Sequence, residues 1–320
     1  MRKIVFLVMF IPVILLTWRS NSFAKEPDNK LCFVQFIHPG GEHKPDSGMI
    51  RTWNTGSHLR KFVINSGASL SSLSDTPVKG DLVFWGEWEP PAEAVKQYEK
   101  ADKGSPRWLF KPYFEKFVKV KPQRTNTDPF IYGNNFLYGN CQQNTKKGPT
   151  QMRALEKGSV ILFGSGLDRD KFVVDTVFVV SDYIDYDESN YTTVLKGKVP
   201  EEYFDVTLYS IFQDTAPAAP KDDDETLGRS FRLYLGATYE KPYNGMFSFF
   251  PCLQASDNKN FKRPAVYNPD IITDNLTQGK RLNPQGNIDD VKEMWTDIAA
   301  QVIKQGLRLG VQTDIPRPLK

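Results

Sequence analysis

The sequence predicts a β-rich α+β fold, in which a mixed or antiparallel sheet or barrel carries an amphipathic helix near the C-terminal end. Three observations support this fold class. Residues 31–37 are a compact apolar run that stops at the turn residues His-Pro-Gly-Gly. Residues 157–180 contain a turn, an apolar run, a loop and a second apolar run, which is typical of a long β-hairpin. Residues 288–303 repeat apolar side chains at helical spacing.

The strands follow from short apolar runs bounded by turn residues. The run at 31–37 (LCFVQFI) has the length of a buried strand. Residues 79–86 (KGDLVFWG) match residues 157–164 (KGSVILFG) in character at every position, which predicts two strands used in similar ways. Shorter strands are expected at 61–64 and 231–239.

Two segments predict helices. Residues 91–103 (PAEAVKQYEKADK) combine helix formers with a proline near the first turn, so we expect a surface helix there. The closing helix has Asn287 as its N-cap and ends at Gly306 or Gly310. The apolar face of the closing helix consists of Ile288, Val291, Trp295, Ile298, Val302 and Ile303.

Residues 196–213 are expected to form a mixture of strand and loop.

The first 24 residues have the three parts of a signal peptide. Arg2 and Lys3 precede an apolar run at 4–18, and Ser22 and Ala24 supply small residues at the −3 and −1 positions of a cleavage site. The run of about 15 residues is short for a helix that must cross about 30 Å of hydrocarbon. We therefore expect a secreted or periplasmic protein without stable membrane insertion after cleavage. An uncleaved anchor, or an extended start before a cytosolic domain, is the alternative.

Cleavage changes the charge balance of the chain. The full sequence carries 41 basic and 38 acidic residues, and removal of three basic residues with the signal peptide leaves 38 of each. Net charge then gives no support for a nucleic-acid partner. After the signal peptide (residues 1–24), we expect a β-rich domain at 25–215, an exposed acidic loop or linker at 216–226, and a second part at 227–320 that packs on the first.

All three histidines of the chain, His38, His43 and His58, lie within one 21-residue stretch. Imidazole is the commonest metal ligand, so these side chains are candidates for a zinc site with one position open for water, and for acid–base catalysis. The alternative is a polar surface loop whose histidines bond to backbone groups. The same stretch supplies further candidates for ligand binding, namely Glu42, Arg51 and Trp53.

Residues 84–90 (FWGEWEP) place two tryptophans beside acidic residues. Trp85, Glu87 and Trp88 could form the wall of a ligand site, since indole faces stack on sugars, bases and cations. The alternative is that the tryptophans belong to the core and the glutamate to a solvated rim.

Residues 96–124 are basic and aromatic, with nine Lys or Arg residues against three acidic ones. Basic groups interleaved with rings suit a polyanion or single-stranded nucleic acid. Residues 182–225 have the opposite charge, with twelve acidic and three basic residues, so the two segments could instead compensate each other. The candidates for polyanion binding are Lys111, Lys116, Lys119 and Arg124.

The three cysteines, Cys32, Cys141 and Cys252, form at most one disulfide, and the sequence does not select the pair. Cys141 is a candidate nucleophile if one of the histidines acts as its base. The alternative is that the cysteines are buried thiols that pack as small hydrophobic side chains.

The hairpin at 157–180, with its fainter echo at 79–86, resembles the hairpin of PUA/ASCH-type β-barrels. These small folds take part in the recognition of RNA and modified bases. The resemblance covers about 25 residues and implies a nucleic-acid or modified-base binding function.

Three functions are therefore compatible with the sequence. The first is an exported β-rich protein that binds a small ligand in a site lined by histidine and tryptophan. The second is a metal- or thiol-dependent hydrolase that uses His38, His43 and His58, with Zn as the expected cofactor. The third is a PUA-like nucleic-acid reader. We expect the partner to be a small ligand or a polyanion.

Overall fold

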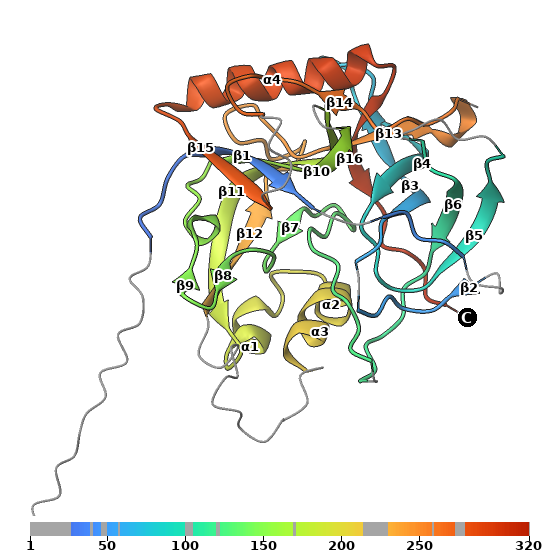
Figure 1. Ribbon diagram of the computed structural model, residues 1–320, viewed down its shortest axis with the longest axis horizontal. Helices are drawn as coiled ribbons and strands as arrows, with labels where there is room; N and C mark the ends of the chain where they lie inside the picture. The colour runs from blue at the N-terminus through green and yellow to red at the C-terminus, as the bar shows by residue number, and fades with distance from the viewer. Residues whose placement is uncertain are drawn as a thin grey trace, which may run out of the picture.

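The computed structural model shows two sheets that lie side by side (Figure 1). The predicted signal peptide at 1–24 and the predicted acidic loop at 216–226 lie outside the residues that the structure describes. The described residues are 27–38, 41–45, 50–56, 58–99, 105–119, 122–168, 171–213, 230–257, 259–272 and 279–319.

The first sheet has the order β15-β1-β10-β11-β12-β7, with β14 paired to β11. β1 runs parallel to β10 and the other pairs are antiparallel, so the sheet is mixed. The predicted strand at 31–37 and the predicted hairpin at 157–180 are confirmed as β1 and as β10–β11. The bounds are β1 (Cys32–Ile37), β7 (Leu137–Tyr138), β10 (Val160–Asp168), β11 (Lys171–Asp187), β12 (Ser230–Gly236), β14 (Ala265–Val266) and β15 (Lys280–Pro284).

The second sheet has the order β16-β13-β4-β3-β6-β5-β2. Because β16 also pairs with β3, the strands β3, β4, β13 and β16 close into a small four-stranded barrel. The bounds are β2 (Ile50–Arg51), β3 (Lys61–Leu70), β4 (Val78–Gly86), β5 (Ala92–Gln97), β6 (Trp108–Pro112), β13 (Phe250–Gln254) and β16 (Arg308–Thr313), with a separate ribbon of β8 (Asn144–Thr145) and β9 (Gly148–Pro149).

Strand β3 changes partner along its length. Its first residues pair in parallel with β6, up to Val63 opposite Phe110. Its last residues pair with β16, from Gly67 opposite Thr313 to Leu70 opposite Leu309. Between these two ladders, Ser66 O already accepts a backbone hydrogen bond of 2.8 Å from Asp314 N, whereas Ile64 and Asn65 have a strand ladder on the β4 side only.

The closing helix α4 (Ile288–Lys304) is confirmed and lies across one end of the molecule (Figure 1). The Asn287 side chain accepts a hydrogen bond of 2.9 Å from Asp290 N, as an N-cap does. Gly306, with φ +80°, follows the last turn in the left-handed conformation that favours glycine. The apolar face of α4 buries Trp295, whose indole N–H donates a hydrogen bond of 3.1 Å to Phe247 O.

Two predictions about secondary structure are wrong. Residues 92–97 form strand β5 instead of a helix, because the ladders to β6 and β2 outweigh the helix propensity of this segment. Residues 191–212 form short helices instead of strand and loop, because their aromatic side chains pack into the core. The short helical segments are α1 (Tyr191–Leu195), α2 (Glu201–Tyr203), a π-helical turn (Phe204–Leu208), α3 (Tyr209–Phe212), and two 3-10 turns, η1 (Gln151–Arg153) and η3 (Ala255–Asp257).

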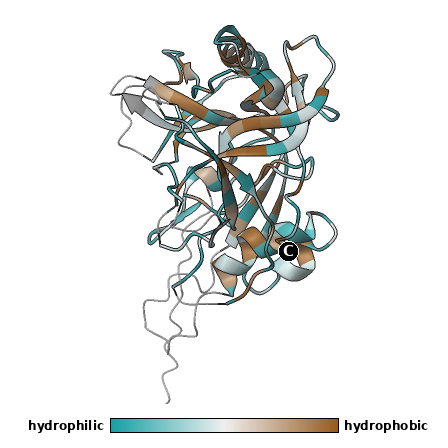
Figure 2. Ribbon diagram, turned by 90° about the vertical axis from the view of Figure 1, so that its right-hand side faces the viewer, coloured by the Kyte–Doolittle hydropathy of each residue, from teal (hydrophilic) through white to brown (hydrophobic). Residues whose placement is uncertain are grey.

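Two apolar cores hold these layers together. One contains residues of both sheets and of α1 to α3, and the other lies beneath α4. In Figure 2 the strands carry much of the hydrophobic colour and the connecting loops are largely hydrophilic. Both sheets draw strands from 25–215 and from 227–320, so these two parts of the chain share their sheets. Among the described helices, none is long and apolar enough to span a bilayer.

Candidate metal centre

A cluster of buried charged side chains lies just past one end of the β3–β4 hairpin. The last pair of this ladder is Lys61 opposite Gly86. If this register is continued beyond the ladder, Arg60 lies opposite Glu87 one residue further on, and His58 lies opposite Glu89 three residues further on. Alternate residues of an extended chain share a face, so these four side chains point to the same side.

Glu87 is held by groups from three segments and is 5% exposed. Its Oε2 lies 2.7 Å from Arg60 Nη1, at ion-pair distance but without hydrogen-bond angles, and 3.3 Å from Nε2 of His38, which directly follows β1. Its Oε1 lies 3.3 Å from His58 Nδ1 and accepts a hydrogen bond of 3.2 Å from Asp128 N. One oxygen of Glu87 is thus anchored by cationic or imidazole groups, and the other faces His58.

Glu89 is fully buried and has the same division between its oxygens. Oε2 accepts hydrogen bonds from the Asn54 side chain and, at 2.6 Å, from the Thr125 hydroxyl. Oε1 lies 3.1 Å from His58 Nδ1. In each glutamate, Oε2 is therefore fixed by neighbouring residues and is called the outer oxygen here. Oε1, the inner oxygen, lies close to Nδ1 of His58.

The converging atoms lie close enough together that they could hold a metal ion. His58, Glu87 and Glu89 each offer one ligand atom, and these atoms lie within 4.8 Å of one another. Ligand atoms bonded to zinc at about 2.0 to 2.2 Å in a tetrahedral arrangement are about 3.3 Å apart. The two distances from His58 Nδ1, 3.1 and 3.3 Å, are close to this value.

Asp128 and Cys141 form an adjoining polar wall. The Asp128 carboxylate accepts hydrogen bonds from the backbone N–H groups of Gly139, Asn140 and Cys141 at 2.8 to 3.0 Å. Burial raises the pKa of Asp128 to about 6 in spite of these donors. Burial, together with the charges of Asp128 and Glu87, raises the pKa of the Cys141 thiol well above its usual value.

The ionisation of the cluster is set by its internal pairing. Burial alone would lower the pKa of His58, but its hydrogen bonds to Glu87 and Glu89 raise this pKa to about 10. Burial raises the pKa of Glu87 above its ordinary value. Burial acts in the same direction on Glu89, but the hydrogen bond and charge of His58 and the charge of Lys61 hold the pKa of Glu89 below its ordinary value. His58 is therefore an imidazolium at neutral pH in the metal-free protein.

His38 differs from His58 in its protonation. Burial, followed by the positive charges of Arg60 and His58, keeps the pKa of His38 well below its ordinary value. The side chain is therefore neutral at pH 7. Its Nε2 lies next to the outer oxygen of Glu87, so His38 can donate a hydrogen bond to the carboxylate.

The structure brings together only part of the predicted histidine site. His38 and His58 both contact Glu87, whereas His43 is fully buried and packs against Phe110, with 5.8 Å between ring centroids. The group of metal-ligand atoms within the described residues contains His58 and two glutamates, not the three histidines. His43 is separated because its backbone pairs with Arg60, which directs the side chain to the β6 side.

The three predicted tryptophans are core residues, each at most 6% exposed. Trp88 donates to Pro91 O at 3.3 Å, and Trp53 donates to Thr125 O at 2.9 Å. The Arg263 guanidinium lies over the ring of Trp85, 4.8 Å from its centroid. Glu87 is buried beside them rather than on a solvated rim, so neither predicted version of this segment describes it fully.

The remaining candidates are dispersed. Glu42 accepts backbone hydrogen bonds from Arg107 and from Trp108. Arg51 is in β2 opposite Ala92, and its side chain is outside the described part. The polyanion candidates are spread over the region that follows β5: Lys111 is exposed in β6, Lys116 and Lys119 are exposed beyond it, and Arg124 pairs with Glu115 at 3.4 Å and lies over Trp53.

The sequence also contained a signal for residues that the prediction missed. Glu89, Arg60 and Asp128 were not candidates, although two of them alternate with site residues in His58-Leu59-Arg60 and Glu87-Trp88-Glu89. Both triplets adjoin expected strands, and pairing of those strands as a hairpin would have aligned them. The cysteines Cys32, Cys141 and Cys252 are free thiols.

Comparison with protein-family models, with curated proteins and with solved structures found no match. The resemblance to PUA/ASCH-type barrels therefore stays a prediction. The hairpin β10–β11 belongs to the first sheet, whereas the four-stranded barrel is built from β3, β4, β13 and β16.

Proposed function

We propose that this protein binds a divalent metal ion, with Zn²⁺ as the best fit, through His58, Glu87 and Glu89. The main support for this proposal is that the two oxygens of each carboxylate have different partners. Outer oxygens are fixed by Arg60, Asn54 and other neighbours, and inner oxygens face His58 Nδ1 at 3.1 and 3.3 Å. Such anchoring of the ligands is typical of metal sites, where outer groups orient the inner ones.

His58 is the solvent-facing member of the group. The His58 side chain is 34% exposed, whereas Glu87 and Glu89 are buried. Zn²⁺ takes nitrogen and oxygen ligands at four-coordinate sites, and three protein ligands leave one position for water. The ligand of the exported binding protein suggested by the sequence is, in this proposal, the metal ion itself.

Binding must displace a proton. His58 coordinates a metal only in its neutral form, and its pKa is about 10 in the metal-free protein. We therefore expect metal affinity to rise about tenfold for each pH unit between pH 7 and about pH 10.

A metal-assisted hydrolase is a second candidate, favoured by one further observation. Arg60 Nη2 is buried and has no hydrogen-bond acceptor among the described residues. A substrate oxygen beside the metal would supply that acceptor, and a metal-bound water would supply the nucleophile. The thiol-dependent version has less support, because a Cys141 whose pKa is raised is a poor nucleophile at neutral pH.

Calorimetric titration of tag-free, chelator-treated protein with Zn²⁺ tests the proposal. We expect one ion per chain, with about one proton released at pH 7, measured in buffers of different ionisation enthalpy. The His58→Gln variant should lose at least about a hundredfold in affinity, since it removes one ligand. His43→Gln is the matched control, because it removes an imidazole that is outside the group, and circular dichroism must show that it folds.

Two results would contradict the proposal. One is the absence of stoichiometric binding by the folded wild type. The other is a His58→Gln variant that binds Zn²⁺ as tightly as the wild type. For the hydrolase candidate, a panel of p-nitrophenyl esters and phosphates should be hydrolysed by the metal-loaded wild type and not by His58→Gln.

A further inference from the structure

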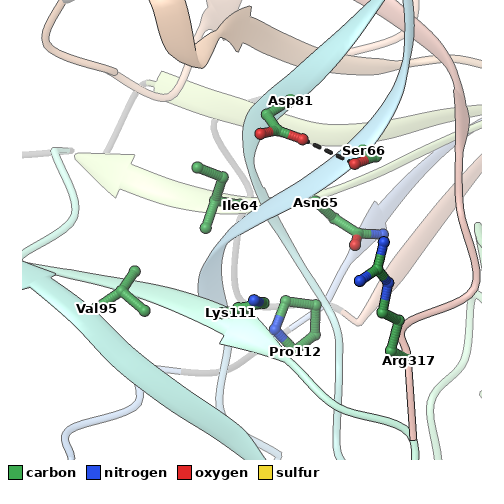
Figure 3. Close-up of a pocket in the computed structure, with 8 residues that line it drawn as sticks. All are labelled: Ile64, Asn65, Ser66, Asp81, Val95, Lys111, Pro112 and Arg317. Atoms are coloured by element: carbon green, nitrogen blue, oxygen red, sulfur yellow. Dashed lines mark hydrogen bonds between the residues drawn. The ribbon is translucent and has the colours of Figure 1, made fainter.

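A pocket of about 440 Å³ opens where strand β3 changes partner (Figure 3). Neither His58 nor Glu87 is among the residues that line it. β3 leaves β6 after Val63 and joins β16 at Gly67, so the strands separate between these residues. Pro112, the last residue of β6, has no N–H group with which to extend the ladder. The volume lies within the range of about 300 to 1,000 Å³ that small-molecule sites occupy.

The charged residues of the pocket are unevenly paired. Lys111 and Arg317 are exposed, and neither belongs to an ion pair among the described residues. The Lys111 ammonium lies 5.9 Å from the centroid of the Tyr113 ring, and the backbone of Lys111 is opposite Glu93 in the β5–β6 ladder. Asp81 is oriented by a hydrogen bond of 2.7 Å from the Ser66 hydroxyl. Figure 3 shows Asp81 and Arg317 on different sides of the hollow.

An apolar wall completes the pocket. Ile64, Val95 and Pro112 line it, and Val95 is 47% exposed. Burial of such surface by a ligand is favourable at about 25 cal/mol per Å². The pocket therefore combines two exposed cations that have no carboxylate at ion-pair distance among the described residues, one oriented carboxylate and an exposed apolar surface.

We propose that this pocket binds the carboxylate end of an apolar amino acid, either free or as the last residue of a short peptide. Lys111 and Arg317 contact the carboxylate, for which a guanidinium is well shaped. The apolar wall contacts the side chain, and Asp81 accepts a hydrogen bond from the α-nitrogen. This assignment is independent of the metal centre.

A second hollow gives room for a longer ligand. It has a volume of about 400 Å³, shares Ser66 and Asp81 with the first pocket, and is also lined by Lys79 and Gln312. The two hollows therefore adjoin at Ser66 and Asp81. In a peptide, the residue before the last would lie in this second part.

Titration of the full-length protein with L-leucine, glycyl-L-leucine and L-leucinamide, followed by calorimetry, tests the assignment. Leucine or glycyl-leucine should bind saturably, and leucinamide, which lacks the carboxylate, should bind at least about tenfold more weakly. Tighter binding of leucine indicates the free amino acid, and tighter binding of glycyl-leucine indicates the peptide. Saturable binding of neither compound, or equal binding of leucinamide, would overturn the proposal.

Variants locate the binding. Lys111→Gln and Arg317→Gln should each weaken binding by about three- to tenfold, since both are exposed and partly screened. Lys196→Gln, the same charge change at the C-terminal end of α1, should leave the affinity unchanged. His58→Gln should also bind the ligand normally, which separates this test from that of the metal centre. Unchanged affinity in both pocket variants would reject the assignment.

Discussion

Two regions of one hairpin place charged residues in opposite environments. Past the end of the β3–β4 ladder, Arg60, Glu87 and Glu89 are at most 5% exposed and interact with one another or with close neighbours. In the middle of the same strands, Asp81 is exposed and faces a pocket whose cations have no described carboxylate partner. The same pair of strands therefore supports a closed ionic cluster and an open one.

The difference shows that buried and exposed charges depend on pairing to different degrees. Buried charges must be paired, since an isolated charge costs several kcal/mol to desolvate. The ionic contacts of Glu87 are therefore part of the folded structure even before a metal binds. Exposed charges are solvated by water and can remain unpaired until a ligand arrives. Four predictions test this contrast, from the largest expected effect to the smallest.

Glu87→Gln should destabilise the protein most. It removes the carboxylate charge beside the buried Arg60 guanidinium and beside His58. Removal of one partner of a buried ion pair costs about 3 to 5 kcal/mol in free energy of unfolding. Urea denaturation monitored by tryptophan fluorescence measures this loss. A loss below about 1 kcal/mol would mean that the cluster is solvated more than its burial indicates.

Zn²⁺ should stabilise the wild type by an intermediate amount. A ligand present at one hundred times its dissociation constant stabilises the folded state by about 2.7 kcal/mol. Urea denaturation with and without Zn²⁺ measures the effect. His58→Gln should show little of it at the same metal concentration. Equal stabilisation of both proteins would place the ion elsewhere.

The stability of the metal-free protein should fall as pH rises. The pKa of His58 is about 10 in the folded protein against about 6.5 unfolded, so its stabilising contribution is complete below pH 6.5 and is lost as pH rises through 10. We expect a loss of about 1 to 2 kcal/mol, allowing for solvent screening of this partly exposed side chain. Urea denaturation between pH 6.5 and 10, compared with His58→Gln, measures it. Parallel curves for the two proteins would exclude this linkage.

Asp81→Asn should have the smallest effect on stability. Asp81 is exposed, and its described contact is the Ser66 hydroxyl. An exposed substitution of this kind changes the free energy of unfolding by about 0.5 kcal/mol or less. Compared with Glu87→Gln under the same conditions, it should separate the two regions clearly. A loss similar to that of Glu87→Gln would remove the distinction between them.

The sequence could predict elements that carry their own periodicity. The strand β1, the hairpin β10–β11 and the helix α4 each have an apolar pattern or a cap that is complete within the segment. Residues 92–97 are different, because their helix formers lie in strand β5, which is held in extended form by pairing with β6 and, at its start, with β2. Residues 191–212 are helical because of what their aromatic side chains contact, which no local pattern contains.

The candidate site could be predicted only in part, for a similar reason. Histidine spacing correctly drew attention to His38 and His58, which meet at Glu87. Proximity in sequence also suggested His43, but the backbone pairing of His43 with Arg60 takes it to a different side. Glu89 and His58 are 31 positions apart in the sequence and meet because of the register in which the two strands pair. This register depends on both strands and cannot be read from either one alone.

The partner change of β3 has a consequence for the order in which the molecule assembles. The barrel closes when β16 reaches β3, and the Thr313 hydroxyl then donates to Ser66 O across 247 positions of the chain. Contacts between such distant segments form slowly, since a long loop must be closed before they stabilise anything. Arg317 follows β16 and reaches the pocket only with it. The metal ligands lie within 32 consecutive residues, so we expect this centre to be assembled before barrel closure gives the pocket its final wall.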